Sequence, residues 1–465
     1  MPHAPDHVLT AAQMRDAEQA LIAGGVAVDE LMQRAGRGAA EWVWRISGGR
    51  AVTVLCGPGN NGGDGYVIAE AIRERGGSVQ VIAASAPKTA AARTARGRYQ
   101  GELLGRDADP KGDVLVDCLF GTGLTRPLAA DDLALLNRLA AAHPRRVAVD
   151  LPSGVHADNG MILNQGLPDW HLTLALGAWK PAHFLLPAAA TMGTLRLVPI
   201  GVAAQPEAAG LITRPSLVAP ASDAHKYTRG LLGVVAGAMP GAALLAARAA
   251  QGAGAGYVKL LGEGTGAPAD LVLDRQPLAE VLADSRFAAV LVGPGLGRDA
   301  VARERLVTAL SEPIPAVVDA DALILLSPRH LAEREAALIA TPHHGELFAL
   351  ERAFGLDGSG SKVARAEALA RASGMVVVAK GADTLVAAPD GRLAYAPRAT
   401  SWLSTAGTGD VLAGAIASRL ATGADPFAAA CQGVWLHGRA ARLAPAPFTA
   451  GQLAEQVARA FAICL

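Results

Sequence analysis

The residues best suited to chemistry begin at position 57, in the stretch GPGNNGGDGYVIAE. Its first nine residues hold five glycines, two asparagines and one aspartate, and they directly follow the apolar run AVTVLC. A strand, a glycine-rich turn and a helix in this order present backbone N–H groups to an anion. Asn60, Asn61 and Asp64 add oxygen atoms that suit a hard cation or a polar ring. The structural alternative is a tight glycine turn with the asparagines in left-handed conformations.

Two later loops offer carboxylates in a similar position. VDCLFGTGLTRPL spans residues 116–128 and VDLPSG spans residues 149–154, so Asp117 and Asp150 each end an apolar run. Either aspartate alone could be a cap at a strand end. Ligands of open α/β sheets bind at the carboxyl ends of the strands, so three such loops at one edge predict a pocket.

The second half of the chain has a different site, within SWLSTAGTGDVLAGAIASRL. GTGD at the start of a helix directs N–H groups and the helix dipole at an oxyanion or phosphate, and Asp410 follows directly. The alternative is an ordinary glycine-rich helix start with Asp410 in the first turn. TPHHGE, residues 341–346, suggests a metal site, but no third ligand follows at a useful spacing, so we do not expect zinc there.

Alternating strands and helices position these loops. In the first half we expect strands at 51–57, 78–84, 113–121 and 146–154, and helices at 10–25, 65–77, 88–105 and 131–142, the first capped by Thr10. The pattern restarts after about residue 223, with LLGVVAGA, YVKLLG, AAVLVGPGLG, PAVVDADAL and MVVVAKGADTLVAA as strand segments. The alternation predicts parallel βαβ units and doubly wound α/β sheets.

Composition supports more than one α/β domain. The 465 residues exceed one ordinary core, and 51% of them are hydrophobic, mostly Ala, Val and Leu. A stretch rich in Pro, Ala and Ser separates the halves, and their motifs differ. We therefore predict two unlike domains, 1–205 and 223–465, joined by a linker at 206–222.

Charge and cysteine content narrow the cellular setting. Lys+Arg and Asp+Glu both number 42, which argues against a chain-wide nucleic-acid or membrane surface. Residues 1–19 lack the basic and apolar regions of a signal peptide, and charges and prolines interrupt the apolar stretch 171–204. The four cysteines form no CxxC pair and indicate reduced, buried thiols in a cytoplasmic protein. The Ala-rich helices suggest a homo-oligomer.

The first half resembles a known family. GPGNNGGDG, VDCLFGTGL and VDLPSG occur in this order in the YjeF N-terminal domain, the NAD(P)H-hydrate epimerase family, and the match runs from about residue 10 to 202. The resemblance implies a Rossmann-like domain that interconverts the R and S forms of NADHX and NADPHX, with Asp150 as the acid/base residue. It implies potassium held by Asn61, Asp117 and Ser153. The implied substrate-binding residues are Asn60, Asn61, Gly62, Gly63, Asp64, Gly121, Thr122, Gly123, Leu124, Thr125, Arg126, Pro127 and Asp150. Lys180, in GAWKP, either reaches this pocket or lies on the surface.

The second half resembles the ribokinase-like superfamily. VGPGLG, VVDADAL, TPHHGE, KGADTLV and AGTGDVLAG together look like the YjeF C-terminal domain, the ADP-dependent NAD(P)H-hydrate dehydratase, over about residues 223–464. The resemblance implies ADP as co-substrate, Mg²⁺, and Asp410 as the base. The implied hydrate-binding residues are Ala242, Gly295, His343 and Asp410. The implied nucleotide-binding residues are Lys380, Gly381, Ala382, Asp383, Thr384 and Gly409.

The resemblances imply a bifunctional metabolite-repair enzyme. Asp410 would take the proton of the C6 hydroxyl as it attacks the terminal phosphate of ADP, and phosphate would then leave, giving NAD(P)H and AMP. The epimerase would supply the epimer that the dehydratase accepts.

Some positions depart from the family, and two rivals stay open. His344 stands where the family has Pro, Ile324 where it has Asn, and TSWLSTA replaces a small turn before GTGD. GTGD alone would permit a vitamin or small-molecule kinase with a ligand-binding N-terminal domain. The N-terminal fold also occurs in RNA-decapping scaffold proteins, although zero net charge and the Asp117, Asp150 and Ser153 set argue against a scaffold.

Overall fold

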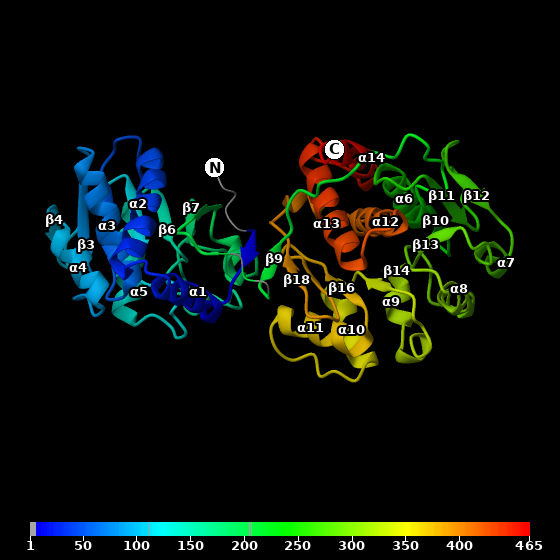
Figure 1. The fold of residues 1–465 in the computed structure, drawn as a ribbon, viewed down its shortest axis with the longest axis horizontal. Coiled ribbons are helices and arrows are strands. Elements are labelled where there is room, and N and C mark those ends of the chain that lie inside the picture. Colours follow the sequence, from blue (N-terminus) through cyan, green and yellow to red (C-terminus); the bar gives the residue numbers. More distant parts are fainter. Residues whose placement is uncertain (1–5, 111, 204, 206) are drawn as a thin grey trace. The chain divides into compact units, whose positions relative to one another are not determined.

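A computed structural model describes residues 6–110, 112–203, 205 and 207–465. The chain divides into two compact units, Met1–Gly210 and Leu211–Leu465 (Figure 1). The described strands form two sheets, and β1 and β9 belong to the larger one. The two-domain α/β organisation expected from the sequence is confirmed. In the described part, no helix is both long enough and apolar enough to cross a membrane.

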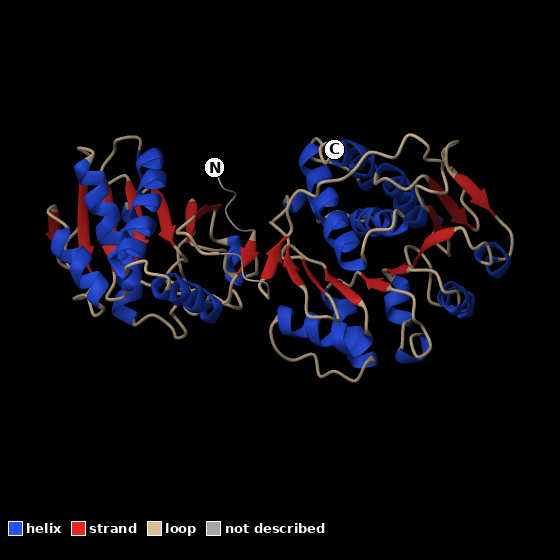
Figure 2. Ribbon diagram, in the orientation of Figure 1, coloured by secondary structure: helices blue, strands red, loops and turns tan. Residues whose placement is uncertain are grey.

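The first unit is built on a parallel sheet, which confirms the predicted doubly wound type. Its strand order is β4-β3-β2-β5-β6-β7-β8, and all neighbouring strands are parallel. The helices α2, α3 and α4 pack together on one face, and α5 packs on the other (Figure 2). The elements are β1 (His7–Val8), α1 (Ala11–Ala23), α2 (Val28–Ser47), β2 (Val52–Cys56), α3 (Asn60–Glu74), β3 (Val79–Ala83), α4 (Ala90–Arg98), β4 (Glu102–Leu104), β5 (Val114–Cys118), α5 (Ala130–Ala142), β6 (Arg145–Val149), β7 (Leu172–Leu176), the 3₁₀ turns η1 (Pro181–His183) and η2 (Ala188–Ala190), β8 (Thr194–Val198) and β9 (Ala209–Leu211), which pairs with β1.

The second unit has the strand order β18-β17-β16-β15-β14-β13-β10-β11-β12. The strands from β16 to β12 in this order are parallel, while β16, β17 and β18 pair in antiparallel fashion. The helices α6, α12, α13 and α14 pack together on one face, while α8 to α11 lie on the other (Figure 1). The elements are β10 (Leu231–Val235), α6 (Pro240–Gly252), β11 (Tyr257–Leu261), β12 (Val272–Asp274), α7 (Leu278–Leu282), β13 (Phe287–Val292), α8 (Ala300–Ser311), β14 (Ala316–Val318), α9 (Asp321–Leu325), η3 (Pro328–His330), β15 (Leu338–Ala340), α10 (His344–Ala353), α11 (Lys362–Ser373), β16 (Val376–Ala379), β17 (Leu385–Ala387), β18 (Leu393–Tyr395), η4 (Ser401–Leu403), α12 (Thr408–Ala421), α13 (Pro426–Leu443) and α14 (Ala450–Ala462).

The expected strands of the first half are present, but two helix predictions need correction. The helix predicted over 65–77 already begins at Asn60, so the two asparagines lie within its first turn. The helix predicted over 88–105 ends at Arg98, and Glu102–Leu104 form the edge strand β4. The sheet edge offers this short segment hydrogen-bonding partners that the local sequence does not reveal.

The segment predicted as a linker is partly structured. It contains β9, and Leu217 within it is buried against α14 and neighbouring helices, with its N–H donating to the Cys464 carbonyl. The exact domain ends given above stay a prediction.

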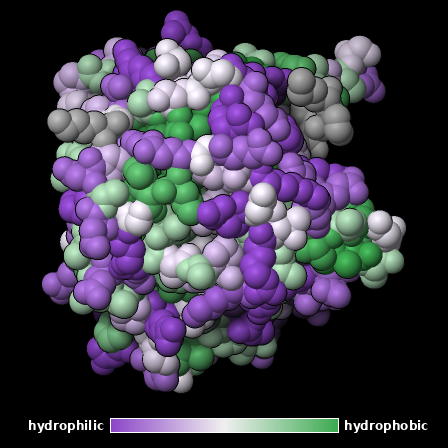
Figure 3. All heavy atoms as spheres, turned by 90° about the vertical axis from the view of Figure 1, so that its left-hand side faces the viewer, coloured by the Kyte–Doolittle hydropathy of each residue, from purple (hydrophilic) through white to green (hydrophobic). Residues whose placement is uncertain are grey.

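The face in Figure 3 is mainly hydrophilic, with apolar residues in separate patches, while Ala, Val and Leu dominate the cores.

Close packing between helices of the second unit depends on glycines, which have no side chain. A Cβ added at Gly414 of α12 would lie 2.0 Å from the Ala246 carbonyl oxygen of α6. Gly433 of α13 meets Ile416 of α12 in the same way, with a Cβ contact of 2.4 Å. These glycines let α12 lie against both neighbours, and α12 carries the GTGD segment.

We predict that Gly414→Ala destabilises the second unit. Because the added methyl group would meet backbone rather than a movable side chain, overpacking should cost about 1–3 kcal/mol of unfolding free energy. Gly451→Ala is the matched control, because its Cβ would meet nothing closer than 3.8 Å. Thermal unfolding of both variants checks the prediction, and equal midpoints would contradict it.

Candidate functional sites

The three loops predicted from the sequence do meet at one edge of the first sheet. The strands β2, β5 and β6 are parallel neighbours in this order, so the loops after Cys56, Cys118 and Val149 leave the same edge. A Cβ at Gly57 would lie 1.8 Å from the Leu119 carbonyl oxygen. The first loop therefore touches the second, and only glycine permits this distance.

The glycines serve close packing rather than left-handed turns. A Cβ at Gly62 would lie 2.0 Å from the Gly57 carbonyl oxygen, and one at Gly63 would lie 2.5 Å from Met32. Asn60 and Asn61 are helical, and the described non-glycine residues with positive φ are Asp150 and Ala320. The structural alternative of left-handed asparagines is therefore wrong.

Asp117 and Ser153 form a buried network between the second and third loops. Asp117 accepts hydrogen bonds from the Leu119 N–H at 3.0 Å, the Ser153 N–H at 2.9 Å and the Ser153 hydroxyl at 2.7 Å. Burial raises the pKa of Asp117 to about 6, although these hydrogen bonds oppose the shift. The Ser153 hydroxyl oxygen also accepts from the Phe120 N–H at 2.9 Å, which fixes the second loop.

Asn61 contributes an oxygen atom that has no partner. Its amide nitrogen donates to the Val149 carbonyl at 3.3 Å, while its Oδ1 is buried without a hydrogen bond. Asn61 borders Gly121, whose added Cβ would lie 3.3 Å from the Asn61 Cγ and 3.0 Å from the Asp150 Oδ2. The structure thus brings Asn61, Gly121 and Asp150 together.

Lys180 reaches this site and is not a surface residue. Its side chain is 1% exposed, and its Nζ lies 2.5 Å from the Asp150 Oδ1 and 2.6 Å from the Leu176 carbonyl. Burial alone would raise the pKa of Asp150, but the charge and hydrogen bond of Lys180 outweigh it and lower that pKa. Asp150 is therefore held as a carboxylate, and its Oδ2 also accepts from the Thr122 N–H at 3.2 Å.

Two further carboxyl groups border this ion pair. Burial, and then the charges of Asp150 and Glu18, raise the pKa of Asp64 well above its ordinary value. Burial and Asp150 likewise raise the pKa of Glu18, on α1. Environments that separate the pKa values of neighbouring carboxyls are typical of acid–base sites. The sequence analysis missed Glu18, because it lies far from the three loops along the chain.

The remaining predicted residues of this site are spread along the second loop. Leu124 is buried, with its N–H donating to the Gly121 carbonyl at 3.2 Å. The exposed residues are Asn60, Gly123, Thr125, Arg126 and Pro127. They are accessible to a ligand, while Gly62 and Gly63 are buried.

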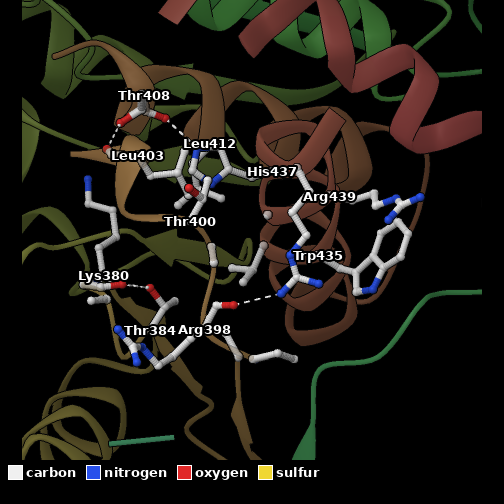
Figure 4. Close-up of a pocket in the computed structure, with 18 of the residues that line it drawn as sticks. Lys380, Thr384, Arg398, Thr400, Leu403, Thr408, Leu412, Trp435, His437 and Arg439 are labelled. Carbon is white, nitrogen blue, oxygen red and sulfur yellow. Dashed lines mark hydrogen bonds between the residues drawn. The ribbon is translucent and has the colours of Figure 1, made fainter. Parts of the chain in front are cut away.

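In the second unit, GTGD forms the start of α12, as predicted. Gly407 precedes the helix in a left-handed conformation with φ 89°, and Thr408 begins it. The Thr408 hydroxyl donates to the Leu403 and Thr405 carbonyls at 2.8 and 2.9 Å. The Thr408 carbonyl lies 2.9 Å from the Nε2 of His437, a buried residue of α13 (Figure 4). The sequence analysis did not single out His437.

Asp410 lies among other charged groups. Lys380 Nζ is 2.6 Å from the Asp319 Oδ1, which also accepts from the Thr341 hydroxyl at 2.7 Å. Glu346 Oε2 lies 3.9 Å from the same Nζ. Burial and then the charge of Asp319 raise the pKa of Asp410 to about 7, which Lys380 partly opposes. Near neutral pH, Asp410 can therefore exist with or without its proton.

A cavity of about 520 Å³ opens beside this cluster. Lys380 and Thr384 border it on one side, and residues of α12 and α13 such as Leu412 and Trp435 border it on the other (Figure 4). Of the predicted nucleotide-binding residues, it is lined by Lys380, Gly381, Ala382, Thr384 and Gly409. Asp383 is not among the lining residues, and its Oδ1 lies 2.5 Å from the Lys362 Nζ.

The predicted hydrate-binding residues come from different segments of the chain. A Cβ at Gly295 would lie 3.1 Å from the Ala242 Cβ, so these two residues adjoin. Their loop borders the Asp319 loop, since a Cβ at Gly293 would lie 1.8 Å from the Asp319 carbonyl oxygen. His343 caps α10, with its Nδ1 accepting from the Gly345 and Glu346 N–H groups.

The family departures lie at accessible positions. Ile324, on α9, is 37% exposed, and His344 at the start of α10 is also exposed. TSWLSTA contains the short turn η4, and Ser401, Leu403 and Ser404 line the cavity. The altered segment thus forms part of the cavity wall.

Comparisons with known proteins agree with this two-site organisation. The family model described as YjeF-related protein N-terminus matches residues 28–182, and the model described as NAD(P)H-hydrate dehydratase matches residues 232–462. The bifunctional NAD(P)H-hydrate repair enzyme Nnr of Mycobacterium leprae is 34% identical, covering 97% of each chain. The Nnr of Moorella thermoacetica is 34% identical, covering 88% of this chain and 87% of that protein.

The similar solved structures include an ADP/ATP-dependent NAD(P)H-hydrate dehydratase from Bacillus subtilis, co-crystallised with ATP and Mg²⁺. It is 28% identical, covers 54% of this chain and 95% of its own, and has a TM-score of 0.47. The relatives that span the whole chain decide the assignment. The protein belongs to the family of bifunctional NAD(P)H-hydrate repair enzymes.

Proposed function

We propose that the first unit epimerises hydrated NADH and NADPH and that the second dehydrates the S form with ADP. The observation that carries the proposal is that each unit holds one aspartate suited to proton transfer, at the carboxyl edge of its sheet. Asp150 is ionised beside Lys180, and Asp410 has a pKa of about 7 beside the cavity. Both lie in a chain whose family acts on these hydrates.

In the first site, Asp150 moves a proton at the C6 hydroxyl of the hydrate. As the hydroxyl proton leaves to Asp150, the C6–N1 bond breaks and an aldehyde forms at C6, while N1 takes a proton. Asp64, whose raised pKa favours its protonated form, can supply it. Rotation about the C5–C6 bond and closure on the opposite face reverse these transfers and invert C6. Asn60, Thr125 and Arg126 are accessible to bind the nucleotide portion.

A potassium ion fits the oxygen atoms beside this centre. Asn61 Oδ1 is buried without a partner, and Asp117 and Ser153 supply further oxygens around the same loop. When bound there, potassium would supply charge compensation and order the loops. Proton transfer itself would stay with Asp150.

In the second site, Asp410 takes the proton of the C6 hydroxyl. The hydroxyl oxygen forms a bond to the terminal phosphorus of ADP, and the bond from that phosphorus to the bridging oxygen breaks, releasing AMP. The N–H groups at the start of α12 and Lys380 stabilise the phosphoryl charge. The C6–O bond then breaks as N1 donates its electron pair, and C5 gives a proton to the departing phosphate, which yields hydrogen phosphate and NAD(P)H. The carboxylates near Asp410 suit Mg²⁺, which would neutralise phosphate charge.

A coupled repair assay tests both activities. Purified protein with both epimers of NADHX, ADP, Mg²⁺ and K⁺ should return all of the NADH absorbance. Asp150→Asn should slow epimerisation at least about 100-fold and leave S-form dehydration intact, because it removes one proton-transfer group. Asp410→Asn should slow dehydration of the S form and leave epimerisation intact. Phosphorylation of another small molecule without NADH recovery would favour the vitamin-kinase alternative.

We predict that potassium accelerates epimerisation selectively. Replacing K⁺ by tetramethylammonium at constant ionic strength should lower the epimerisation rate, because this cation is too large for the Asn61 and Ser153 oxygens. Dehydration of the pure S form is the internal control. Asn61→Ala should raise the K⁺ concentration needed for half-maximal rate, and unchanged K⁺ dependence would contradict the assignment.

The pH dependence of dehydration should follow Asp410. The base must be unprotonated, so kcat/KM should rise with pH through a value near 7. Asp321 contributes to the raised pKa of Asp410, so Asp321→Asn should move this limb to lower pH. Asp270→Asn removes the same charge from an exposed position and should leave the profile unchanged. A profile flat between pH 6 and 8 would exclude Asp410 as the titrating base.

A further inference from the structure

A buried histidine joins the two charged residues of the first site through the main chain. His183 ends the turn η1 and is 0% exposed. Its Nε2 lies 2.9 Å from the Asp150 carbonyl oxygen, and its Nδ1 lies 2.9 Å from the Lys180 backbone nitrogen. One ring therefore contacts the backbones of both members of the Asp150–Lys180 ion pair.

The partners of the ring define its protonation. A backbone N–H only donates, so Nδ1 accepts from Lys180 and carries no proton. The proton is then on Nε2, which donates to the Asp150 carbonyl. Burial and the charge of Lys180 lower the pKa of His183 to about 4, in agreement with a neutral ring. Trp179 and Phe184 contact the ring edge-on at centroid distances of 5.6 and 6.3 Å.

The Asp150 backbone needs such support. Its φ of 67° is left-handed, a conformation that non-glycine residues adopt only where the surroundings impose it. The Asp150 N–H donates to the Leu174 carbonyl at 2.7 Å, and His183 binds the Asp150 carbonyl on the other side of the residue. The residue is thus held at both of its backbone polar groups, with its carboxylate directed at Lys180 and the Thr122 N–H.

We propose that His183 is a positioning residue of the epimerase centre, whose neutral ring holds the Asp150 main chain so that the carboxylate meets Lys180 and the substrate. The proposal rests on the epimerase function proposed above. His183 does not touch the substrate, and it acts through the direction of the Asp150 carboxylate.

Two substitutions of His183 each keep a different one of the two hydrogen bonds that the ring makes. In His183→Asn, the amide oxygen can take the place of Nδ1 and accept from Lys180, but nothing reaches Asp150. In His183→Gln, the amide nitrogen reaches the place of Nε2 and can still donate to the Asp150 carbonyl. We expect His183→Asn to lower the kcat of epimerisation about 10-fold to 100-fold with little change in KM, because misplacing a catalytic group by about 1 Å costs this much. His183→Gln should recover most of the rate.

The pH profile provides a second readout. If Asp150 turns away from Lys180, it loses the interaction that lowers its pKa. The acid limb of epimerase kcat/KM should therefore move to higher pH in His183→Asn and stay in place in His183→Gln. A general loss of folded protein would lower the amplitude without moving the limb.

The outcomes distinguish this proposal from the function itself. If the wild type does not interconvert the epimers, the epimerase function fails. If the wild type is active and Asp150→Asn is equally fast, the acid/base role of Asp150 fails, and the positioning role of His183 fails with it. If the wild type is active, Asp150→Asn is inactive and His183→Asn keeps the wild-type kcat, only the positioning role fails. If both His183 variants unfold, nitrogen NMR of the wild-type imidazole decides. A neutral ring protonated on Nε2 supports the proposal, and any other state overturns it.

Discussion

The buried ion pair of Asp150 and Lys180 is the constraint on which the first site depends. The two side chains are 10% and 1% exposed, so neither charge can be stabilised by water. Removing one partner of such a pair typically costs about 3–5 kcal/mol, because the other charge is left buried alone. Further hydrogen bonds stabilise both buried charges. The Leu176 carbonyl accepts a hydrogen bond from Lys180, and the Thr122 N–H donates one to Asp150. The second loop is therefore held in place by the same carboxylate that we propose as the acid/base residue.

The second unit also buries charged groups at its site, but there a single lysine lies among several carboxylates. Lys380 pairs with the buried Asp319, so one cation is surrounded by several carboxylates and cannot compensate all of them. Burial first, and then the excess negative charge, raise the pKa of Asp410. Asp150, with a cation of its own, is shifted in the opposite direction. Burial raises the pKa of both aspartates, and the sign of the neighbouring charges thus gives them different proton affinities. A buried imidazole also contacts the main chain at each aspartate. His183 contacts the carbonyl of Asp150 itself, and His437 contacts the carbonyl of Thr408, two residues before Asp410.

Local sequence was sufficient where chemistry is concentrated in one segment. The strands at 52–56 and 114–118 follow from apolar runs bounded by glycine or aspartate, and Asp117 and Ser153 belong to recognisable strings. Lys180 lies 30 residues from Asp150, and its role depends on how β7 returns beside β6, so the sequence left it open. Glu18 and His183 are harder still, because nothing in their neighbourhood distinguishes a residue facing a site from one facing the core. The packing role of the glycines could not be predicted, because their contacts at Leu119 and Met32 come from other segments.

The contacts of the glycines with other backbone segments explain why glycine is required at these positions of the string. A turn would tolerate Asn or Asp at several of its positions, since those residues adopt left-handed conformations. Gly57 and Gly62 instead face carbonyl oxygens at distances that exclude any side chain. Substituting Gly57 would separate the first loop from the second, and substituting Gly62 would push the start of α3 away from Gly57. The string is thus determined by the requirement that Gly57 pack against both the second loop and the start of α3, and Asn61 comes to lie beside Gly121 as a consequence.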